Sequence, residues 1–331
     1  MEIKETIGID VSKLTIDVTI HSTQAYSRFD NEKKGFKLML KWVKKNTDFA
    51  SQNTLYVFEH TGLYSYTLAS FFTDEELPFI IVPGLEIKRS LGITRGKDDR
   101  VDSKVIARYG FRLRDEIKPT ILPSDKLRSL KTLLSLRETK VKQRSGDKAT
   151  LSEYRRVFKT KENKILFEVL ESGIKKLNEM ILKIENEIMV IIKSDSTLKE
   201  QYDLLISIKG IGDQIALNTI VYTEGFTKFK THREYASYCG VAPFPNSSGT
   251  SLRGKTKISN LANKKLKSLL DLGAKSALQH NAEIRLFYER RLEMGKNRMS
   301  TINIIRNKLI ARMFAVIRRG TPYVETMKYA S

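Results

Sequence analysis

The stretch Ile7-Gly8-Ile9-Asp10-Val11-Ser12-Lys13 is a short apolar run with an acid near its end. It overlaps a strand-like segment, Glu5–Asp10, and a tight turn leads to a second one, Leu14–Ile20, in which side chains alternate outward and inward. Two more β-rich runs, Thr54–Phe58 and Pro78–Val82, follow further along the chain. Helical segments separate these later runs, so we expect an α/β domain in which helices pack against a mixed sheet.

Helical periodicity fills the intervals between the strands and dominates after Pro123. Phe36, Leu40 and Val43 form one helical stripe, and Leu63–Phe72 and Val101–Leu113 predict two more helices. We expect a domain over residues 1–120, a coiled-coil and oligomerisation region over 121–200, and a mainly helical domain with glycine-rich connections over 201–331.

The middle region begins with Ser124, which follows a proline and is suited to cap a helix. An a/d seam then predicts a helix that needs a partner, either folded back within the chain or from a second subunit. Antiparallel pairing with additional dimer contact is favoured, because Gly146 and Gly173 are expected to interrupt the region. The seam residues are Phe167, Leu170, Ile174, Leu177, Ile181, Ile184, Ile188 and Ile191.

The composition favours a polyanionic partner. Among 331 residues, 59 are Lys or Arg and 38 are acidic, a net charge of +21, which points to nucleic acid. A membrane surface is a distant second, because no apolar run approaches the roughly 20 residues of a spanning helix. Cys239 is the only cysteine, which excludes an intrachain disulfide and a thiolate zinc site, and the four histidines lack metal-binding spacing. No signal-like stretch opens the chain, so we expect a bacterial cytoplasmic, nucleoid-associated protein.

Four acids are candidates for a metal site. Asp10 and Glu59 each end a buried strand-like run, where α/β sheets place reactive groups. Asp99 and Asp102 are three residues apart at the start of a helix and so share a face. Such carboxylates repel one another unless a cation lies between them, and Mg²⁺ or Mn²⁺ is the cation they suit. Alternatively, each acid is a turn residue or a helix-start residue that interacts with the macrodipole.

A glycine turn and a serine cluster are candidates for contact with nucleic acid. Lys209, Gly210 and Gly212 lie in the turn before a helical run, where backbone N–H groups can bind phosphate. The turn is similar to helix-hairpin-helix modules that bind the DNA backbone without reading its sequence, although a plain turn is an equal alternative. The cluster over residues 246–251 predicts a solvated loop. Basic residues that could neutralise a phosphate follow it, namely Arg253, Lys255 and Lys257. A serine hydroxyl attacks phosphate only when activated, and a carboxylate-bound metal is the natural activator here.

These motifs resemble the DEDD transposases of the insertion-sequence one-ten family. The resemblance rests on Gly8–Lys13, on Glu59 with Thr61-Gly62, and on Lys97–Asp102. It implies an N-terminal domain similar to the RuvC branch of the RNase H fold, with Asp10, Glu59, Asp99 and Asp102 as the metal-binding acids. Asp98 stands where the family commonly has threonine, and the spacing to Asp102 favours Asp99 over it.

The resemblance extends to the C-terminal domain, through Gly240–Pro243 and the following Ser-Gly and basic run. It implies Ser248 as the nucleophile, with the adjacent Ser247 left open. It further implies a recombinase that forms a phosphoserine link to DNA, frees a 3′ hydroxyl, and excises and integrates its own element. Dimers or tetramers and a noncoding RNA that pairs with donor and target DNA are also implied.

Two other functions are compatible with the residues themselves. One is a metal-dependent junction nuclease that cuts through activated water, in which the serine segment is structural. The other is a non-enzymatic nucleic-acid-binding protein, whose binding would not depend on Mg²⁺ or on the four acids.

Overall fold

The computed structural model describes residues 2–90, 99–159, 161–248 and 252–325. Within these ranges, the side chains at 99–100, 245–248 and 252–257 lie outside the description. The chain divides into two compact units, Met1–Leu122 and Pro123–Ser331, which are taken in turn.

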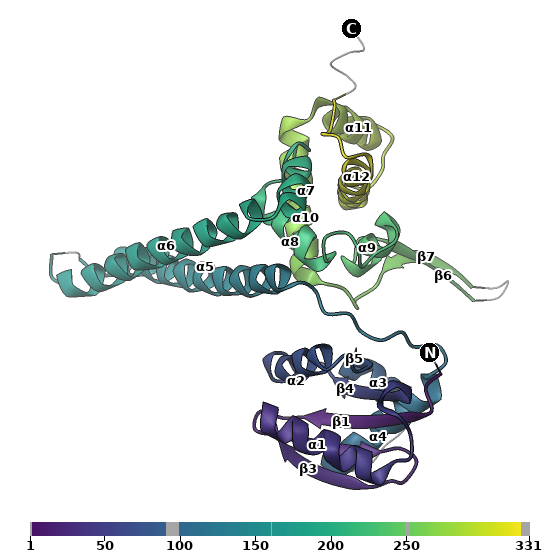
Figure 1. The fold of residues 1–331 in the computed structure, drawn as a ribbon. Helices are drawn as coiled ribbons and strands as arrows, with labels where there is room; N and C mark the ends of the chain where they lie inside the picture. Colours follow the sequence, from purple (N-terminus) through teal and green to yellow (C-terminus); the bar gives the residue numbers. More distant parts are fainter. Residues whose placement is uncertain (1, 91–98, 160, 249–251, 326–331) are drawn as a thin grey trace. The chain divides into compact units, whose positions relative to one another are not determined.

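The first unit is built on a five-stranded mixed sheet in the order β3-β2-β1-β4-β5 (Figure 1). β1 is antiparallel to β2 and parallel to β4, while β2–β3 is antiparallel and β4–β5 parallel. The predicted mixed sheet is therefore confirmed. Its strands are β1 (Glu5–Val11), β2 (Thr15–Ile20), β3 (Tyr26–Asp30), β4 (Thr54–Glu59) and β5 (Phe79–Val82).

Of these five strands, only β3 was absent from the prediction. Its residues, Tyr26–Asp30, are mostly polar and none of them is fully buried, so it lacks the apolar alternation of a core strand. It forms because β2 offers it a full set of antiparallel partners.

One face of the sheet packs on α1 (Lys33–Asn46) and α2 (Leu63–Asp74). Ile7, Ile9 and Val11 alternate along β1 and point into this core, where they meet Phe36 and Phe72. The intervening residues of β1 therefore face the opposite side.

The opposite face is covered by α4 (Asp99–Leu113), which with α3 (Gly84–Ser90) contributes to a second core. The Thr6 hydroxyl donates to the Ala107 carbonyl at 2.9 Å, and the Thr19 and Ser103 hydroxyls are 2.8 Å apart. Gly8 permits this approach, because a Cβ there would overlap backbone atoms of Ser103 and Ala107.

The second unit begins with two long helices, α5 (Asp125–Val157) and α6 (Lys164–Lys193). Ser124 caps α5 as predicted, accepting a hydrogen bond from the Leu127 amide. Arg137 pairs with Glu185 and Arg155 with Glu171, which shows that the helices run antiparallel (Figure 1).

The seam of α6 is buried or half-buried, with Phe167, Ile181 and Ile188 as its most buried residues. The expected interruptions are wrong, because α5 continues through Gly146 and α6 through Gly173. A helical glycine costs about 1 kcal/mol relative to alanine, which the paired faces of helices of 33 and 30 residues outweigh. Supercoiling and contact with a second subunit stay predictions.

The other helices of this unit pack around one core, which the inner ends of α5 and α6 also join through Leu130 and Ile192. The three-region division therefore stays a functional prediction, while the structure has two units. The remaining elements are α7 (Ser196–Ile206), α8 (Asp213–Tyr222), α9 (His232–Tyr238), β6 (Pro243–Ser248), β7 (Leu252–Ile258), α10 (Lys264–His280), α11 (Ala282–Glu293) and α12 (Arg298–Arg319).

The antiparallel hairpin β6–β7 corrects the prediction of a loop at the serine cluster, since Asn246–Ser248 lies on β6. Asn, Ser and Pro are poor strand formers, and the pairing with β7 compensates for that weak local preference. Within the described part of the chain, no helix is long and apolar enough to cross a membrane.

Candidate active site

Asp10 and Glu59 lie at the carboxyl ends of two neighbouring parallel strands, Asp10 as the last residue but one of β1 and Glu59 as the last residue of β4. Ile9 of β1 is in register with Phe58 of β4, so the two acids are the next residues along their strands. Residues at matching register positions point to the same face of a sheet. Asp10 shares its face with Thr6 and Gly8, so this is the face that α4 covers. Both acids are half-buried.

The start of α4 lies toward the same end of β1. Ala107 contacts Thr6 and Gly8, while Ser103, one turn earlier in the helix, contacts Gly8. Moving along β1 toward Asp10 therefore corresponds to moving toward the first turn of α4.

Asp99 and Asp102 occupy that first turn, directly before the buried Ser103. The structure therefore brings the backbone of all four predicted acids to one end of one sheet face. Asp102 is half-buried, the Asp99 side chain lies outside the description, and Asp98 is not among the described residues.

The position of the Glu59 side chain is restricted by Gly84, the first residue of α3. A Cβ on Gly84 would overlap the Glu59 carboxylate, so the acid lies directly against the backbone of the turn after β5. Nearby, Gly62 adopts φ +70° at the start of α2, a conformation that favours glycine and explains the Thr61-Gly62 pair.

The donor set is chemically suited to a hard divalent cation, because it consists of carboxylates on one sheet face. Among the described side chains, no group of three or more His, Cys, Asp and Glu is close enough to hold a metal ion. The side chains of Asp98 and Asp99 are not among the described ones.

Two charged residues on this face were missed by the sequence analysis. Asp17 of β2 lies directly opposite Asp10, and Arg28 of β3 lies directly opposite Asp17. The Arg28 Nε donates to Asp17 Oδ1 at 2.9 Å, and the Tyr26 hydroxyl donates to the same oxygen. The alternation of β2 could have indicated Asp17, whereas Arg28 lies on β3, the one strand of this sheet that was not predicted.

The predicted nucleophile lies in the second unit, on β6. Ser248 is in register with Leu252, and Ser247 with Arg253. Lys255 and Lys257 follow on β7, and Lys257 is in register with Phe244. The hairpin thus brings the backbone of the serines and of a basic segment next to each other.

Gly210 and Gly212, which were predicted to bind phosphate, lie in the turn between α7 and α8 in different environments. Gly210 adopts φ +96°, and a Cβ there would overlap Gly273 and Ala277 of α10, so packing explains this glycine. Nothing lies within 4 Å of a Cβ on Gly212. The Lys209 ammonium is 3.0 Å from the Glu325 carboxylate. Phosphate contact by this turn stays a prediction.

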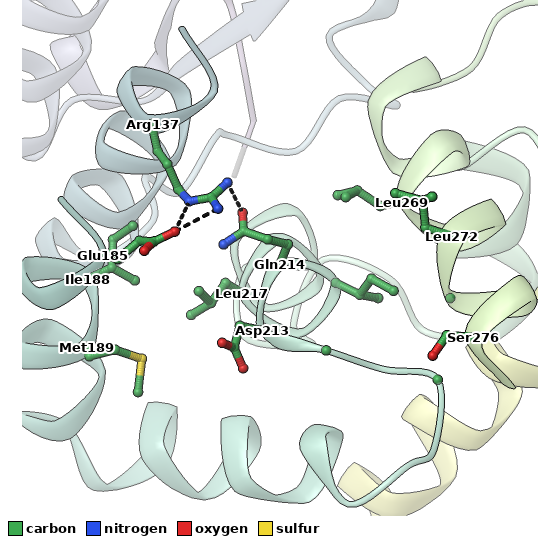
Figure 2. Close-up of a pocket in the computed structure, with 14 residues that line it drawn as sticks. Arg137, Glu185, Ile188, Met189, Asp213, Gln214, Leu217, Leu269, Leu272 and Ser276 are labelled. Atoms are coloured by element: carbon green, nitrogen blue, oxygen red, sulfur yellow. Dashed lines mark hydrogen bonds and ion pairs between the residues drawn. The ribbon is translucent and has the colours of Figure 1, made fainter. Parts of the chain in front are cut away.

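Beside this turn lies an open cavity of about 430 Å³, shown in Figure 2. The Arg137 side chain of α5 lines this cavity, and it donates hydrogen bonds to Glu185 of α6 at 2.7 Å and to Gln214 of α8 at 3.0 Å. Asp213 also lines the cavity, so the first turn of α8 carries a carboxylate beside its N–H groups.

Comparison with known proteins identifies the family. One family model, described as a transposase of the DEDD type, matches residues 7–154, and another, described as "Transposase IS116/IS110/IS902 family", matches residues 202–289. The chain is 30% identical over 332 aligned positions to the pilin gene-inverting protein of Moraxella bovis, covering 97% of this chain and 98% of the relative. The chain belongs to the IS110 family of transposases.

Other relatives agree with that membership. The pilin gene-inverting protein of Moraxella lacunata is also 30% identical over 332 positions, with the same coverage of 97% and 98%. The IS110 uncharacterized 43.6 kDa protein of Streptomyces coelicolor is 32% identical over 124 residues, 38% of this chain and 30% of that protein. This IS110-family chain is therefore a DNA-rearranging enzyme, and its DEDD family implies the use of a divalent metal.

Proposed function

We propose that this IS110-family enzyme cuts and rejoins DNA through the Ser248 hydroxyl, with Asp10, Glu59, Asp99 and Asp102 holding Mg²⁺ or Mn²⁺. The observation that carries the proposal is the register of β1 and β4, in which Ile9 pairs with Phe58, so that Asp10 and Glu59 follow this pair side by side. Both acids therefore lie at the end of the sheet that is next to the start of α4. The family membership supports it, since the two matched segments contain the acids and the serine respectively.

The chemistry is a transesterification. The Ser248 oxygen forms a bond to the scissile phosphorus while the bond from phosphorus to the 3′ oxygen breaks, and the serine proton passes to solvent or a nearby base. The leaving 3′ oxygen takes up a proton and becomes a 3′ hydroxyl, and the 5′ phosphate stays on the enzyme. Attack by a 3′ hydroxyl of another strand reverses these steps and frees the serine, so no external energy source is needed.

The acids and the basic hairpin have separate roles in this proposal. A bound divalent cation supplies charge stabilisation for the phosphate and lowers the pKa of an attacking hydroxyl. Arg253, Lys255 and Lys257 neutralise DNA phosphates near the serine, and Lys209, Gly210 and Gly212 bind backbone phosphate further away.

Excision with integration and inversion both follow from this one reaction, because they differ in the arrangement of the exchanged ends. Two Moraxella relatives carry inversion in their names, which supports a site-specific exchange of this type. A noncoding guide RNA that pairs with donor and target DNA, and a dimer or tetramer, are part of the proposal through the family resemblance.

The test is covalent capture of DNA on a substrate with a nick near the scissile bond, in Mg²⁺, with the guide RNA transcribed from the element. We expect the wild type to form a phosphoserine adduct and Ser248→Ala to form none, with DNA binding within about twofold of the wild type. Ser247→Ala is the matched control and retains the adduct.

The other outcomes separate the alternatives. A covalent adduct formed by Ser248→Ala would show that Ser248 is not the nucleophile. Cut DNA without an adduct on the wild type would favour the water-dependent nuclease. Binding without cutting, insensitive to Mg²⁺ and to Asp10→Asn, would favour a non-enzymatic binding protein. Full covalent capture of DNA after removal of all RNA would refute the proposed RNA guidance, while the proposed serine chemistry would still stand.

A further inference from the structure

Val241 lies where the chain leaves the helices of the second unit and enters the hairpin β6–β7. It is fully buried, and its amide donates to the Ala236 carbonyl of α9 at 3.0 Å. The strand β6 begins at Pro243, and Ser248 is its last residue. Figure 1 shows the hairpin extending away from the helices of its unit. A change of backbone direction at Val241 is therefore transmitted along β6 to Ser248.

Two asparagines of α12 bind the Val241 carbonyl. The Nδ2 amide of Asn303 donates to this oxygen at 2.8 Å, and that of Asn307 donates to it at 2.9 Å. A carbonyl oxygen accepts through two lone pairs, so the two donors occupy both and fix the plane of the peptide group that follows Val241. Asn307 also donates to the Asn303 carbonyl at 2.9 Å, one helical turn earlier, which restricts the orientation of its side chain.

The Asn303 side chain is held in place by a buried ion pair. Its Oδ1 accepts a hydrogen bond from the Arg306 guanidinium at 3.4 Å. Arg306 is 6% exposed and also hydrogen-bonds to Asp271 of α10. Networks of hydrogen bonds at buried positions orient their members more strongly than single bonds do. The Val241 carbonyl is thus connected to both α12 and α10.

The returning end of the hairpin is attached to the same place. Asn263, which caps α10, donates from its backbone amide to the Tyr238 carbonyl of α9 at 2.9 Å. Gly240 has φ +66°, and a Cβ there would overlap the Cβ of Ala262, so the two ends of the hairpin approach closely. Both ends are therefore fixed on the helix side of the two strands.

The distance from Val241 to Ser248 makes a small rotation consequential. Ser248 is seven residues beyond Val241, and at about 3 Å per residue of extended chain the two lie roughly 20 Å apart. A rotation of about 5° at Val241 would then move the serine by about 2 Å. A displacement of about 1 Å of a reacting group can lower a rate about a hundredfold.

We propose that Asn303 and Asn307 are positioning residues, which hold the hairpin at the angle that Ser248 needs to attack DNA by binding the Val241 carbonyl. The inference rests on the proposed role of Ser248 as the nucleophile. Neither asparagine supplies a reacting group or contacts DNA in this role. A single neutral hydrogen bond contributes modestly to stability, so their removal affects the reaction more than the fold.

The test compares the rate of covalent capture of DNA, in Mg²⁺ with the guide RNA, with the spread of distances between two spin labels. The labels are attached to cysteines introduced at Thr250, between β6 and β7, and at Gln279, an exposed residue of α10. Cys239 is fully buried and stays unlabelled. Pulsed electron paramagnetic resonance then measures how far the hairpin moves relative to α10. A role in fold stability alone would not broaden this distance distribution.

Leucine has a shape similar to that of asparagine but no hydrogen-bond donor. We expect Asn303→Leu and Asn307→Leu each to slow capture about five- to tenfold, and the double variant to slow it about a hundredfold. DNA binding should stay within about twofold of the wild type, because the asparagines do not contact DNA in this role. The distance distribution should broaden in each single variant and most in the double variant.

The matched control is Asn218→Leu in α8. Asn218 is 1% exposed, and its amide donates to the Gln214 carbonyl one turn earlier, as the Asn307 amide does to Asn303. The control variant therefore loses a comparable bond within a helix without a change at Val241. We expect it to keep both the capture rate and the distance distribution of the wild type.

A wild-type capture rate in the double variant would overturn the proposal, and so would slower capture with unchanged label distances. Equal losses in Asn218→Leu would also overturn it, because they would then follow from the removal of any buried asparagine. Where the double variant does not fold, the two single variants decide by the same criteria. Capture by Ser248→Ala would instead refute the proposed nucleophile, whereas capture that depends on Ser248 but not on Asn303 or Asn307 would refute this inference alone.

Discussion

Gly8 of β1 and Ser103 of α4 approach so closely that position 8 has no room for a side chain. A Cβ on Gly8 would overlap the carbonyl oxygen of Ser103 and the amide of Ala107. This contact fixes how near the helix comes to the strand, and with it how near the first turn of α4 lies to the end of β1.

Replacing Gly8 by alanine should therefore push α4 away from the sheet. We expect Gly8→Ala to lower the free energy of unfolding by about 1–3 kcal/mol, the usual cost of overpacking. The matched control is Gly146→Ala in α5, where nothing lies within 4 Å of the added atom, and which should gain up to about 1 kcal/mol. Urea denaturation of both variants measures the difference, and equal stabilities would contradict the close approach.

Gly84→Ala should disturb the acid centre more than the fold. The new methyl group meets the Glu59 carboxylate, a side-chain end that can move aside, so we expect a stability change below about 1 kcal/mol. The displaced acid should reduce the rate of DNA capture at least about tenfold, equivalent to about 1.4 kcal/mol of activation free energy. Gly173→Ala, in the open on α6, serves as the control and should capture DNA normally. An unaltered rate in Gly84→Ala would show that the position of Glu59 is not critical.

Asp271 should contribute to stability through Arg306, which is 6% exposed and hydrogen-bonds to it. Burial alone would raise the pKa of Asp271, but hydrogen bonds from Lys275 and Arg306 hold the pKa below its usual range. Its contribution is therefore complete above the ordinary pKa of about 4 and is lost as the pH falls toward the lowered value.

We expect Asp271→Asn to cost about 3–5 kcal/mol at pH 7, because it leaves a buried guanidinium without its charged partner. The deficit should shrink as the pH is lowered below about 4. Asp203→Asn, which breaks an exposed pair with Lys199, should cost less than about 1 kcal/mol. Denaturation at several pH values tests both, and a deficit that grew in acid would reverse the assigned direction.

Cys239 should be unreactive until the second unit unfolds. Burial raises the pKa of its thiol to about 12, so the thiolate is scarce at pH 8 and the sulfur is out of reach of reagents. We expect less than one equivalent to react with a disulfide reagent at pH 8 in buffer and one equivalent in strong denaturant. Because the unfolded thiol ionises near pH 9, the free energy of unfolding should fall as the pH rises above that value, and less so in Cys239→Ala. Rapid labelling of the native protein would contradict the buried position.

The sequence was informative where burial determines structure. Short apolar, β-rich runs predicted β1, β4 and β5, alternation predicted β2, and a capping serine predicted the start of α5, because each of these signals is local. The strand β3 and the hairpin at Ser247 and Ser248 were not predictable, since their residues are polar and their pairing depends on partners distant in the chain.

The positions of the four acids at one end of one sheet face could be predicted from the sequence, whereas their neighbours could not, and their role in binding a metal stays a prediction. Strand ends and helix starts pointed to Asp10, Glu59, Asp99 and Asp102, and family membership agrees with a metal-dependent enzyme. Asp17 and Arg28 are neighbours of Asp10 only through cross-strand register, which no local pattern specifies. Gly146 and Gly173 led to an error of another kind. Each glycine locally favours a break in the helix, but the pairing of two long helices outweighs that preference.

The acids come from segments that the ribosome makes at widely separated times, with β1 first, β4 much later and α4 later still. A nascent chain that ends before α4 has neither Asp99 nor Asp102, and its sheet has one uncovered face. Emergence of α4 therefore covers the open face of the sheet and completes the set of four acids in the same event, so the proposed metal site cannot form on a shorter nascent chain.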